Sequence, residues 1–374
     1  MFIAERRRRF LLGTLVAIAC LQSAVAHPVA QGSLSVTVFP DRVRVQALLS
    51  TEEVLVAASG KQVLPSFEAA VRDHGGYLLD HLQLVVDGRR LQGRITELTP
   101  RKQPSYELEY AVPLAAAREL TLSQDSLREL SFAPGIPWEA SYIVRVAYAD
   151  RPALQGLLLT HAEPLLLRCE RQVCTSGTAG AATSSVLPFV RHGLRHILTG
   201  YDHLLFVIAL ALAVVSFREL VKVIAAFSLA HTITLTLAVL GMIRVSSGIV
   251  EPMIAASIVL VAMLNVVWPR DHQVTSRMAM LVAFTFGLFH GLGFAGGLLE
   301  AMQGMKSTTV AVAIAAFSVG VELGHQAVVL PVFAALYAVR RFSTHAYDRV
   351  RIARRYGSAA ISIAGVAYLA AALA

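Results

Sequence analysis

Charged residues and cysteines are both scarce in this chain. Asp, Glu, Lys and Arg make up 16% of its 374 residues and 55% of the residues are hydrophobic, with a mean hydropathy of +0.59. This composition is too apolar for an ordinary soluble enzyme and too polar for a bundle of membrane helices alone. We therefore expect two parts, one within a membrane and one outside it.

Two features that would indicate other classes of protein are also missing. The chain has no loop of the GxxxxGK[ST] type, so its sequence does not indicate a nucleotide-driven transporter. The formal net charge of +8 is not gathered into a basic stripe interleaved with aromatic side chains. Nucleic acid is therefore not an expected partner.

The first 26 residues are typical of a secretory signal peptide. A charged segment at residues 6–9 precedes an apolar segment at residues 10–20, and small residues at positions 24–26 suit cleavage. A membrane anchor is the alternative, but the apolar segment is shorter than the ~20 residues that a spanning helix needs. The signal predicts export of the following segment, to the periplasm of a Gram-negative cell or to the outer face of another membrane.

The three cysteines fit that compartment. Cleavage after Ala26 would remove Cys20 and leave Cys169 and Cys174 as a pair. Two cysteines so close in an exported segment predict a small disulfide loop. A thiol metal site is the alternative, although no other cysteine remains to complete it.

Residues 27–174 predict an all-β, sandwich-like exported domain. Apolar and polar residues alternate in short runs at residues 34–38, 106–110 and 142–148, as in strands with one buried face. Val86-Asp87-Gly88-Arg89 predicts a hairpin turn. Seven or eight strands fit the segment, with a short helix at residues 66–72. The small and polar residues of 175–187 predict a flexible linker.

Residues 188–374 predict a bundle of six transmembrane helices. Most of their apolar stretches approach or exceed the ~20 residues that span a bilayer. The predicted spans are residues 199–215, 220–243, 249–268, 278–299, 308–338 and 357–374. The fifth is long and contains Gly320, Gly324 and Pro331, so it is expected to tilt, kink or break.

Lysine and arginine in the loops predict the orientation of this bundle. On one side of the membrane, the two loops between spans carry only Arg244 and Lys306, while the other side carries ten lysines and arginines. The positive-inside rule places this richer side in the cytoplasm. Both the β domain and the C-terminus would then face the periplasm. The richer side carries Arg218, Lys222, Arg270, Arg277, Arg340, Arg341, Arg349, Arg351, Arg354 and Arg355.

Ionisable side chains lie within the apolar stretches. Placing such a side chain in a membrane is energetically unfavourable: at the centre of a membrane helix, Asp, Lys or Arg costs roughly 2.5–3.5 kcal/mol. Packing alone therefore does not favour these residues. Imidazoles and carboxylates together are ligands of divalent first-row metal ions. The candidate metal ligands are His196, Asp202, His203, His231, His290, Glu322 and His325.

The first candidates form one stripe on a helix. His192, His196 and His203 fall within about 40° of one another, but His196 and His203 are about 10 Å apart along a straight helix axis. They can hold one ion only if the helix breaks, which Thr199 and Gly200 favour, and Thr199 could then cap the next span. Asp202 suits an outer role or a ligand from a turn. The alternative is a polar collar at the level of the lipid headgroups.

The remaining candidates lie on three other spans. His231 has threonine neighbours, so a lone histidine bonded to a helix carbonyl is its alternative. The glycines around His290 allow either close helix packing or an opened backbone. Glu322 and His325, three residues apart, share a helix face and can bind one metal ion together, or form an internal ion pair. Asn265 and Glu251 are weaker candidates.

Four of these motifs together resemble the HupE/UreJ family of nickel and cobalt permeases, in the branch with a long exported N-terminal region. The resemblance covers about residues 186–374. It rests on His196 followed after five residues by Asp202-His203-Leu-Leu-Phe, on Ala230-His231-Thr-Ile-Thr-Leu, on Phe289-His290-Gly-Leu-Gly-Phe-Ala and on Gly320-Val-Glu322-Leu-Gly324.

The resemblance implies uptake of nickel, sometimes cobalt, for metalloenzymes such as hydrogenase and urease. It places His196, Asp202, His203, His231, His290 and Glu322 on the metal path. The chain departs from the family at Ser318 and His325, where Asn and Gln are usual, and at Leu264, where Glu is frequent. These departures bear on which metal is preferred.

The sequence supports two main hypotheses. The first is an inner-membrane permease, not an enzyme, for a divalent ion (nickel or cobalt, with zinc as a further candidate) and without a prosthetic group. A divalent ion entering a cell at −100 mV gains about 4.6 kcal/mol, so ATP is not required. The second is an intramembrane zinc hydrolase using the same ligands, with Ser228 or Ser318 as its serine. A metal-sensing or accessory protein, with a periplasmic partner on the β domain, is a third.

Overall fold

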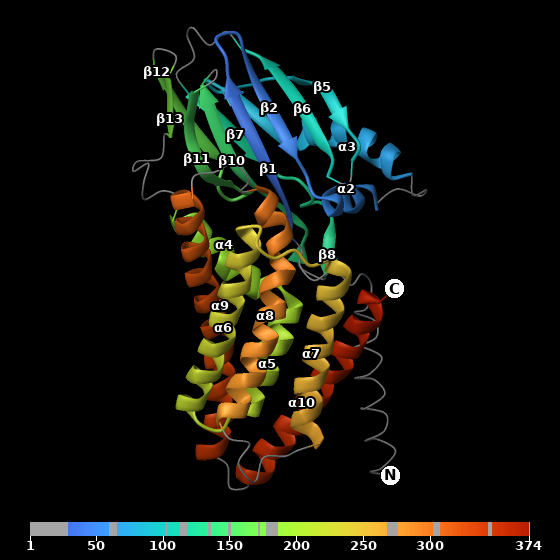
Figure 1. Cartoon of the computed structure of the whole chain (residues 1–374), viewed down its shortest axis with the longest axis vertical. Coiled ribbons are helices and arrows are strands. Elements are labelled where there is room, and N and C mark those ends of the chain that lie inside the picture. The colour runs from blue at the N-terminus through green and yellow to red at the C-terminus, as the bar shows by residue number, and fades with distance from the viewer. Residues whose placement is uncertain are drawn as a thin grey trace. The chain divides into compact units, whose positions relative to one another are not determined.

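The computed structural model describes residues 29–59, 66–101, 103–112, 119–133, 136–148, 151–170, 173–176, 186–267, 276–301, 307–342 and 346–373. The predicted signal peptide, and residues 177–185 of the predicted linker, lie outside these ranges. The chain divides into two compact units, one mostly of strands and one mostly of helices (Figure 1). Each unit is described by itself.

The β-rich unit contains two main sheets. The larger has the order β11 (Arg151–Leu159), β10 (Glu139–Tyr148), β1 (Val29–Val38), β2 (Arg42–Leu48), β6 (Ser105–Ala111), β5 (Gly93–Thr99). The second has the order β13 (Val173–Ser176), β12 (Leu165–Glu170), β7 (Glu119–Gln124), β3 (Leu82–Val86), β4 (Arg89–Arg90). A separate ribbon pairs β8 (Ser131–Ala133) with β9 (Ile136–Pro137). The β1–β10 pair is parallel.

One hydrophobic core joins the two main sheets. Val45 and Leu108 of the larger sheet and Leu84 and Leu122 of the smaller one are completely buried in it. Buried and partly exposed residues alternate along β3 and along most of β6, because successive side chains of a strand point to opposite faces. The predicted β-rich region is therefore confirmed, and its sheets share one core.

The predicted hairpin is confirmed in detail. Val86 pairs with Arg89 across the turn, and Asp87 and Gly88 both have positive φ, 45° and 78°. A two-residue turn of type I′ requires this conformation at both central positions. The turn residues therefore set the register of β3 and β4.

Two helices accompany these sheets. Sequence analysis missed α2 (Thr51–Ala58), whose first turn is capped by Ser50 accepting from the amide of Glu53 at 3.1 Å. The expected short helix begins after Ser66 as predicted, but α3 (Phe67–His81) continues well past residue 72. Paired glycines at residues 75 and 76 disfavour helix locally, and tertiary packing overrides that preference.

The hairpin of β12 and β13 places Cys169 directly opposite Cys174 in backbone register. A disulfide joins positions whose Cα atoms lie close, as they do across paired strands. The register is compatible with the predicted disulfide loop, which stays a prediction.

The helical unit consists of seven helices among the described residues. They are α4 (Val186–Thr199), α5 (Tyr201–Ala213), α6 (Phe217–Val239), α7 (Ser247–Val267), α8 (Ser276–Ala301), α9 (Ser307–Phe342) and α10 (Ala346–Ala372). Buried apolar side chains of α5 to α10 form one core.

The described helices account for part of the predicted membrane bundle. Three of them, α6, α7 and α9, are long and apolar enough to cross a membrane, and α4 with α5 would form a fourth, bent span. α8 contributes only a shorter apolar helix, 277–293, and α10 begins with several arginines. The other two predicted spans stay a prediction. α9 continues without a break through Pro331.

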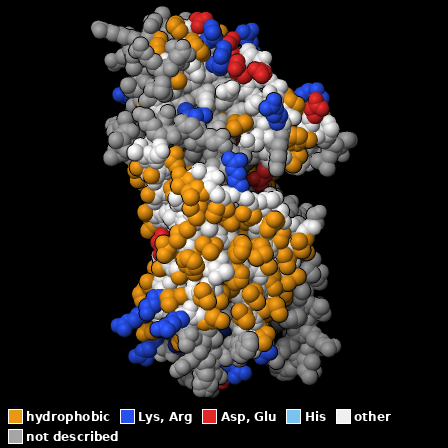
Figure 2. Space-filling model, in the orientation of Figure 1, with side chains coloured by type: hydrophobic (Ala, Val, Ile, Leu, Met, Phe, Trp, Pro, Cys, Tyr) orange, Lys and Arg blue, Asp and Glu red, His pale blue; other side chains and the backbone are white. Residues whose placement is uncertain are grey.

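The surface of the helical unit suits lipid. Figure 2 shows hydrophobic side chains covering its visible face, and Leu229, Leu260 and Leu281 are each about half exposed or more. An apolar surface of this extent indicates contact with a membrane or a partner. Together these features make the chain a membrane protein.

Lysine and arginine side chains gather near one end of the helical unit (Figure 2). Arg340 of α9 donates to the carbonyl oxygen of Val215 at 2.9 Å, and Arg354 of α10 donates to that of Val214. Both carbonyls belong to the α5–α6 connection, so three segments predicted to lie on the positive side do meet.

Candidate metal centre

A break between α4 and α5 brings His196 and His203 together. The two helices are bent by 74°, with Gly200 as the N-cap of α5. The two imidazole ring centres are 4.8 Å apart, whereas a straight helix would hold them about 10 Å apart along its axis. The predicted break at residues 199–200 is therefore present.

Thr199 does not cap α5, contrary to expectation. Its hydroxyl donates to the carbonyl oxygen of Arg195 at 2.9 Å, and Gly200 makes no side-chain cap. The reason is that Thr199 is the last residue of α4, where a hydroxyl readily bonds to the carbonyl four residues earlier.

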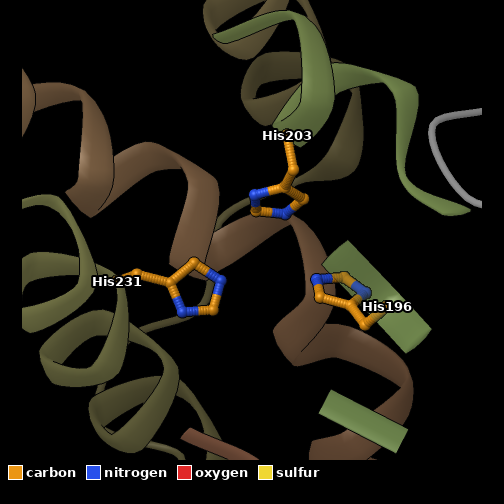
Figure 3. Close-up of side chains that lie close together, drawn as sticks. All are labelled: His196, His203 and His231. Carbon is orange, nitrogen blue, oxygen red and sulfur yellow. The ribbon is translucent and has the colours of Figure 1, made fainter. Parts of the chain in front are cut away.

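His231 of α6 joins these two histidines. Ligand atoms of His196, His203 and His231 all lie within 4.8 Å of one another, and all three residues are buried. Figure 3 shows the three rings pointing toward one another from separate helical segments. This geometry argues against a lone histidine bonded only to its own helix.

A second group overlaps the first. Ligand atoms of Asp202, His203 and His290 also lie within 4.8 Å of one another, again buried. Asp202 lies in the first helical turn of α5, and its expected role as an outer group or a ligand stays a prediction. His203 belongs to both groups.

Glycine allows α8 to carry His290 this close to α6. A Cβ atom on Gly287 would lie 2.5 Å from the carbonyl oxygen of Phe227, which is too close for any side chain. α8 is helical throughout this region. Of the two roles expected for the glycines, the structure has the close packing and not the opened backbone.

Ser257 of α7 orients the ring of His290, and sequence analysis missed it. Its hydroxyl donates to the carbonyl oxygen of Ile254 at 2.6 Å and lies 3.2 Å from Nε2 of His290. Because the hydroxyl proton is used on Ile254, Ser257 accepts from Nε2–H, and Nδ1 carries the lone pair of the neutral ring. A serine within an apolar run gave no signal of this role.

His325 lies next to the two groups without belonging to either. It is completely buried, its ring centre is 6.2 Å from that of His203, and its Nδ1 is 2.9 Å from the hydroxyl of Ser228. Glu322 instead accepts from Gln326 at 2.7 Å. Among the described side chains, Glu322 and His325 form no direct ion pair.

The weaker candidates have different surroundings in the structure. Asn265 donates to the carbonyl oxygen of Ala209 at 2.9 Å, which is an ordinary packing role. Glu251 is half-buried in α7 and belongs to neither three-residue group. His192 is buried but takes no part in either three-residue group.

Phenylalanine rings line the cluster. Phe206 lies 4.7 Å from His290, and Phe227 lies 5.2 Å from both His290 and His325 between ring centres. These apolar walls reduce contact with water and strengthen electrostatic interactions with a bound ion. In the sequence, this lining was indicated only by the presence of these phenylalanines on the histidine-bearing helices α5 and α6.

The donor set has a definite chemistry. Neutral imidazole nitrogens with one carboxylate suit nickel, zinc, copper or iron, and the grouped residues include no sulfur ligand. A neutral imidazole offers one lone pair. His203 can therefore serve only one of the two groups at a time.

Comparison with known proteins identifies the relationship. Residues 172–372 match the family model described as HupE / UreJ protein, and this segment covers more than half of the chain and all the histidines and acids of the cluster. No match was found among curated proteins or solved structures. The chain belongs to the HupE/UreJ family.

Proposed function

We propose that this chain is a permease for a divalent transition-metal ion, with nickel or cobalt as its cargo. The observation that carries the proposal is the convergence of His196, Asp202, His203, His231 and His290 from four separate helices, α4, α5, α6 and α8. Buried ionisable side chains that meet inside a membrane bundle mark an ion pathway. The choice of nickel or cobalt rests on the family.

The overlap of the two groups supports movement of the ion. An ion would pass between a position at Asp202, His203 and His290 and one at His196, His203 and His231. His203 remains a ligand in both, so the ion never loses all of its protein ligands. Transport requires sites that bind well enough to select and weakly enough to release.

We extend the path to Glu322 and His325 as the next polar side chains along α9. Only the ion gradient and the membrane potential are needed, since a divalent cation gains about 4.6 kcal/mol at −100 mV. We further propose six spans in the inner membrane, with the N-terminal domain and the C-terminus in the periplasm. The arginines that gather around the α5–α6 connection support this orientation.

Metal accumulation in a transport-deficient host tests the proposal. Cells expressing the chain are given nickel, cobalt, zinc, copper or manganese, and intracellular metal is measured. His203→Ala should abolish accumulation of the cargo at unchanged membrane expression, because it removes a ligand from both groups. His161→Ala, an exposed position of the β-rich unit, is the matched control. Full uptake by the His203 variant would refute the proposed path.

A second candidate function is an intramembrane hydrolase. The hydrogen-bonded pair of Ser228 and His325, at 2.9 Å, is the observation that favours it. Against it, Ser228 lies inside the continuous helix α6, where backbone amides are committed to helical bonds and offer no oxyanion site. Turnover of a lipid amide by purified protein with zinc, lost in Ser228→Ala, would favour the hydrolase over the permease.

A further inference from the structure

The β-rich unit contains a cavity that the proposed transport path does not use. It has a volume of about 360 Å³ and lies between α2 and α3, lined by Ala57, Asp73, His74, Gly76 and Asp80 among others. Pockets of this size bind small ligands. The matched family segment begins at residue 172, so it does not include this cavity.

The lining of this cavity includes His74, a buried imidazole that can bind a ligand. The residue is only 2% exposed, and neither of its ring nitrogens forms a hydrogen bond with the described part of the chain. A buried polar group without a hydrogen bond costs about 1–3 kcal/mol. An imidazole in this state, lining a cavity, indicates a ligand that supplies the missing interaction.

Glu53 lies beside the His74 ring. It is completely buried, its Oε1 is 3.7 Å from Nε2 of His74, and Oε1 accepts from the hydroxyl of Tyr142 at 2.7 Å. A carboxylate behind a histidine commonly orients that ring for a metal ion on its other nitrogen. Here Nε2 faces the carboxylate, which leaves Nδ1 for the ligand.

Gly76 lines the cavity where it is open. A glycine inside a helix costs about 1 kcal/mol relative to alanine. Its neighbour Gly75 is required by packing, since a Cβ atom there would lie 2.5 Å from Cδ1 of Ile95. A Cβ atom on Gly76 would meet nothing within 4 Å, so this position of the lining faces open space that a larger side chain could fill.

We propose that this cavity captures a hydrated divalent transition-metal ion, with His74 as the protein ligand and Asp73 and Asp80 attracting the ion at the exposed rim. Imidazole with carboxylate and water is a donor set for such ions. An ion that keeps five waters beside the imidazole needs about 150 Å³ for them at ~30 Å³ per water, so the cavity accommodates it. The inference rests on the proposed transport of such an ion, for which an exported unit would be the first point of contact.

Metal binding by the full-length protein in detergent tests this site. The background carries His203→Ala and His290→Ala, which remove both ligand groups of the helical unit. Equilibrium dialysis with nickel should still find one ion per chain. His74→Gln should weaken that binding at least tenfold, while His161→Gln should leave it unchanged. Circular dichroism checks that each variant is folded.

A second pair of variants avoids changing the buried polar cluster. Gly76→Phe fills the cavity and should abolish binding, whereas Gly76→Ala adds one methyl group into open space and should preserve it. Unchanged nickel binding in His74→Gln or Gly76→Phe, or no binding in the background protein, would overturn the proposal. Loss of cellular uptake is measured separately, so the permease and the capture site can fail independently.

Discussion

Replacing Ser257 with alanine tests how strictly the position of His290 is controlled. The serine hydroxyl holds Nε2–H of His290 at 3.2 Å while donating to Ile254. Alanine removes the acceptor, so the ring can exchange its tautomer and rotate out of the arrangement that groups it with Asp202 and His203. Ser257 is completely buried, so bulk water does not take over this role.

The expected effect follows from the partner that is lost. Removing a group that orients a metal-ligating histidine typically lowers metal affinity or activity 10- to 100-fold. That range corresponds to about 1.4–2.7 kcal/mol at 1.36 kcal/mol per factor of ten. Only one of the two groups contains His290, so uptake should fall by this factor and not vanish as in His203→Ala.

Initial rates of nickel uptake, measured against external nickel, provide the assay. Ser358→Ala is the matched control, because Ser358 is also completely buried and its hydroxyl has no hydrogen bond to the described residues. Ser257→Thr keeps the hydroxyl and should restore most of the rate. Equal rates for Ser257→Ala and Ser358→Ala would refute the orienting role of the hydroxyl.

Three further predictions follow from the structure. Protein with an intact cluster and His74→Gln should bind one nickel ion per chain by dialysis, because both groups need His203; two ions would contradict this. Gly291→Val should block the approach of α8 to His231 of α6 and prevent accumulation of folded protein, measured by size-exclusion chromatography, while Gly248→Ala, with its nearest neighbour at 3.7 Å, should not. Burial raises the pKa of Glu53 from 4.5 to about 7, so metal-free wild-type protein loses stability as pH rises through this range. In denaturation followed by fluorescence, Glu53→Gln should therefore be more stable than wild type by about 3 kcal/mol at pH 8 and equally stable at pH 4. A stability difference that does not change with pH would contradict this.

Local sequence patterns predicted much of the local structure. Alternation identified strands β1, β6 and β10, and the Asp-Gly pair identified the turn after β3. Pairing between distant strands was not predictable, since the parallel contact of β1 with β10 joins segments about a hundred residues apart in sequence. Helix α3 was cut short in the prediction because its glycines oppose helix locally while the sheets behind it favour helix.

The candidate metal residues were predictable individually but not as groups. Spacing alone indicated that His196 and His203 need a helix break, because the constraint is local. Which residues of other helices join them depends on the rotation and depth of each helix, which the core decides. Glu322 illustrates this point: three-residue spacing paired it with His325, but its carboxylate bonds to Gln326 one residue further on.

The interruption at Gly200 has an electrostatic consequence. α5 begins at Tyr201 without a side-chain cap, so its amino end contributes a partial positive charge beside Asp202 and His203. In the proposed permease that charge would oppose a bound cation by about 1 kcal/mol, which would shorten the dwell time of the ion roughly fivefold. Structural zinc sites bind their ion with about 10–16 kcal/mol of free energy. A transport site that bound its ion so tightly would release it too slowly. An uncapped helix start next to the ligands thus favours rapid turnover over storage.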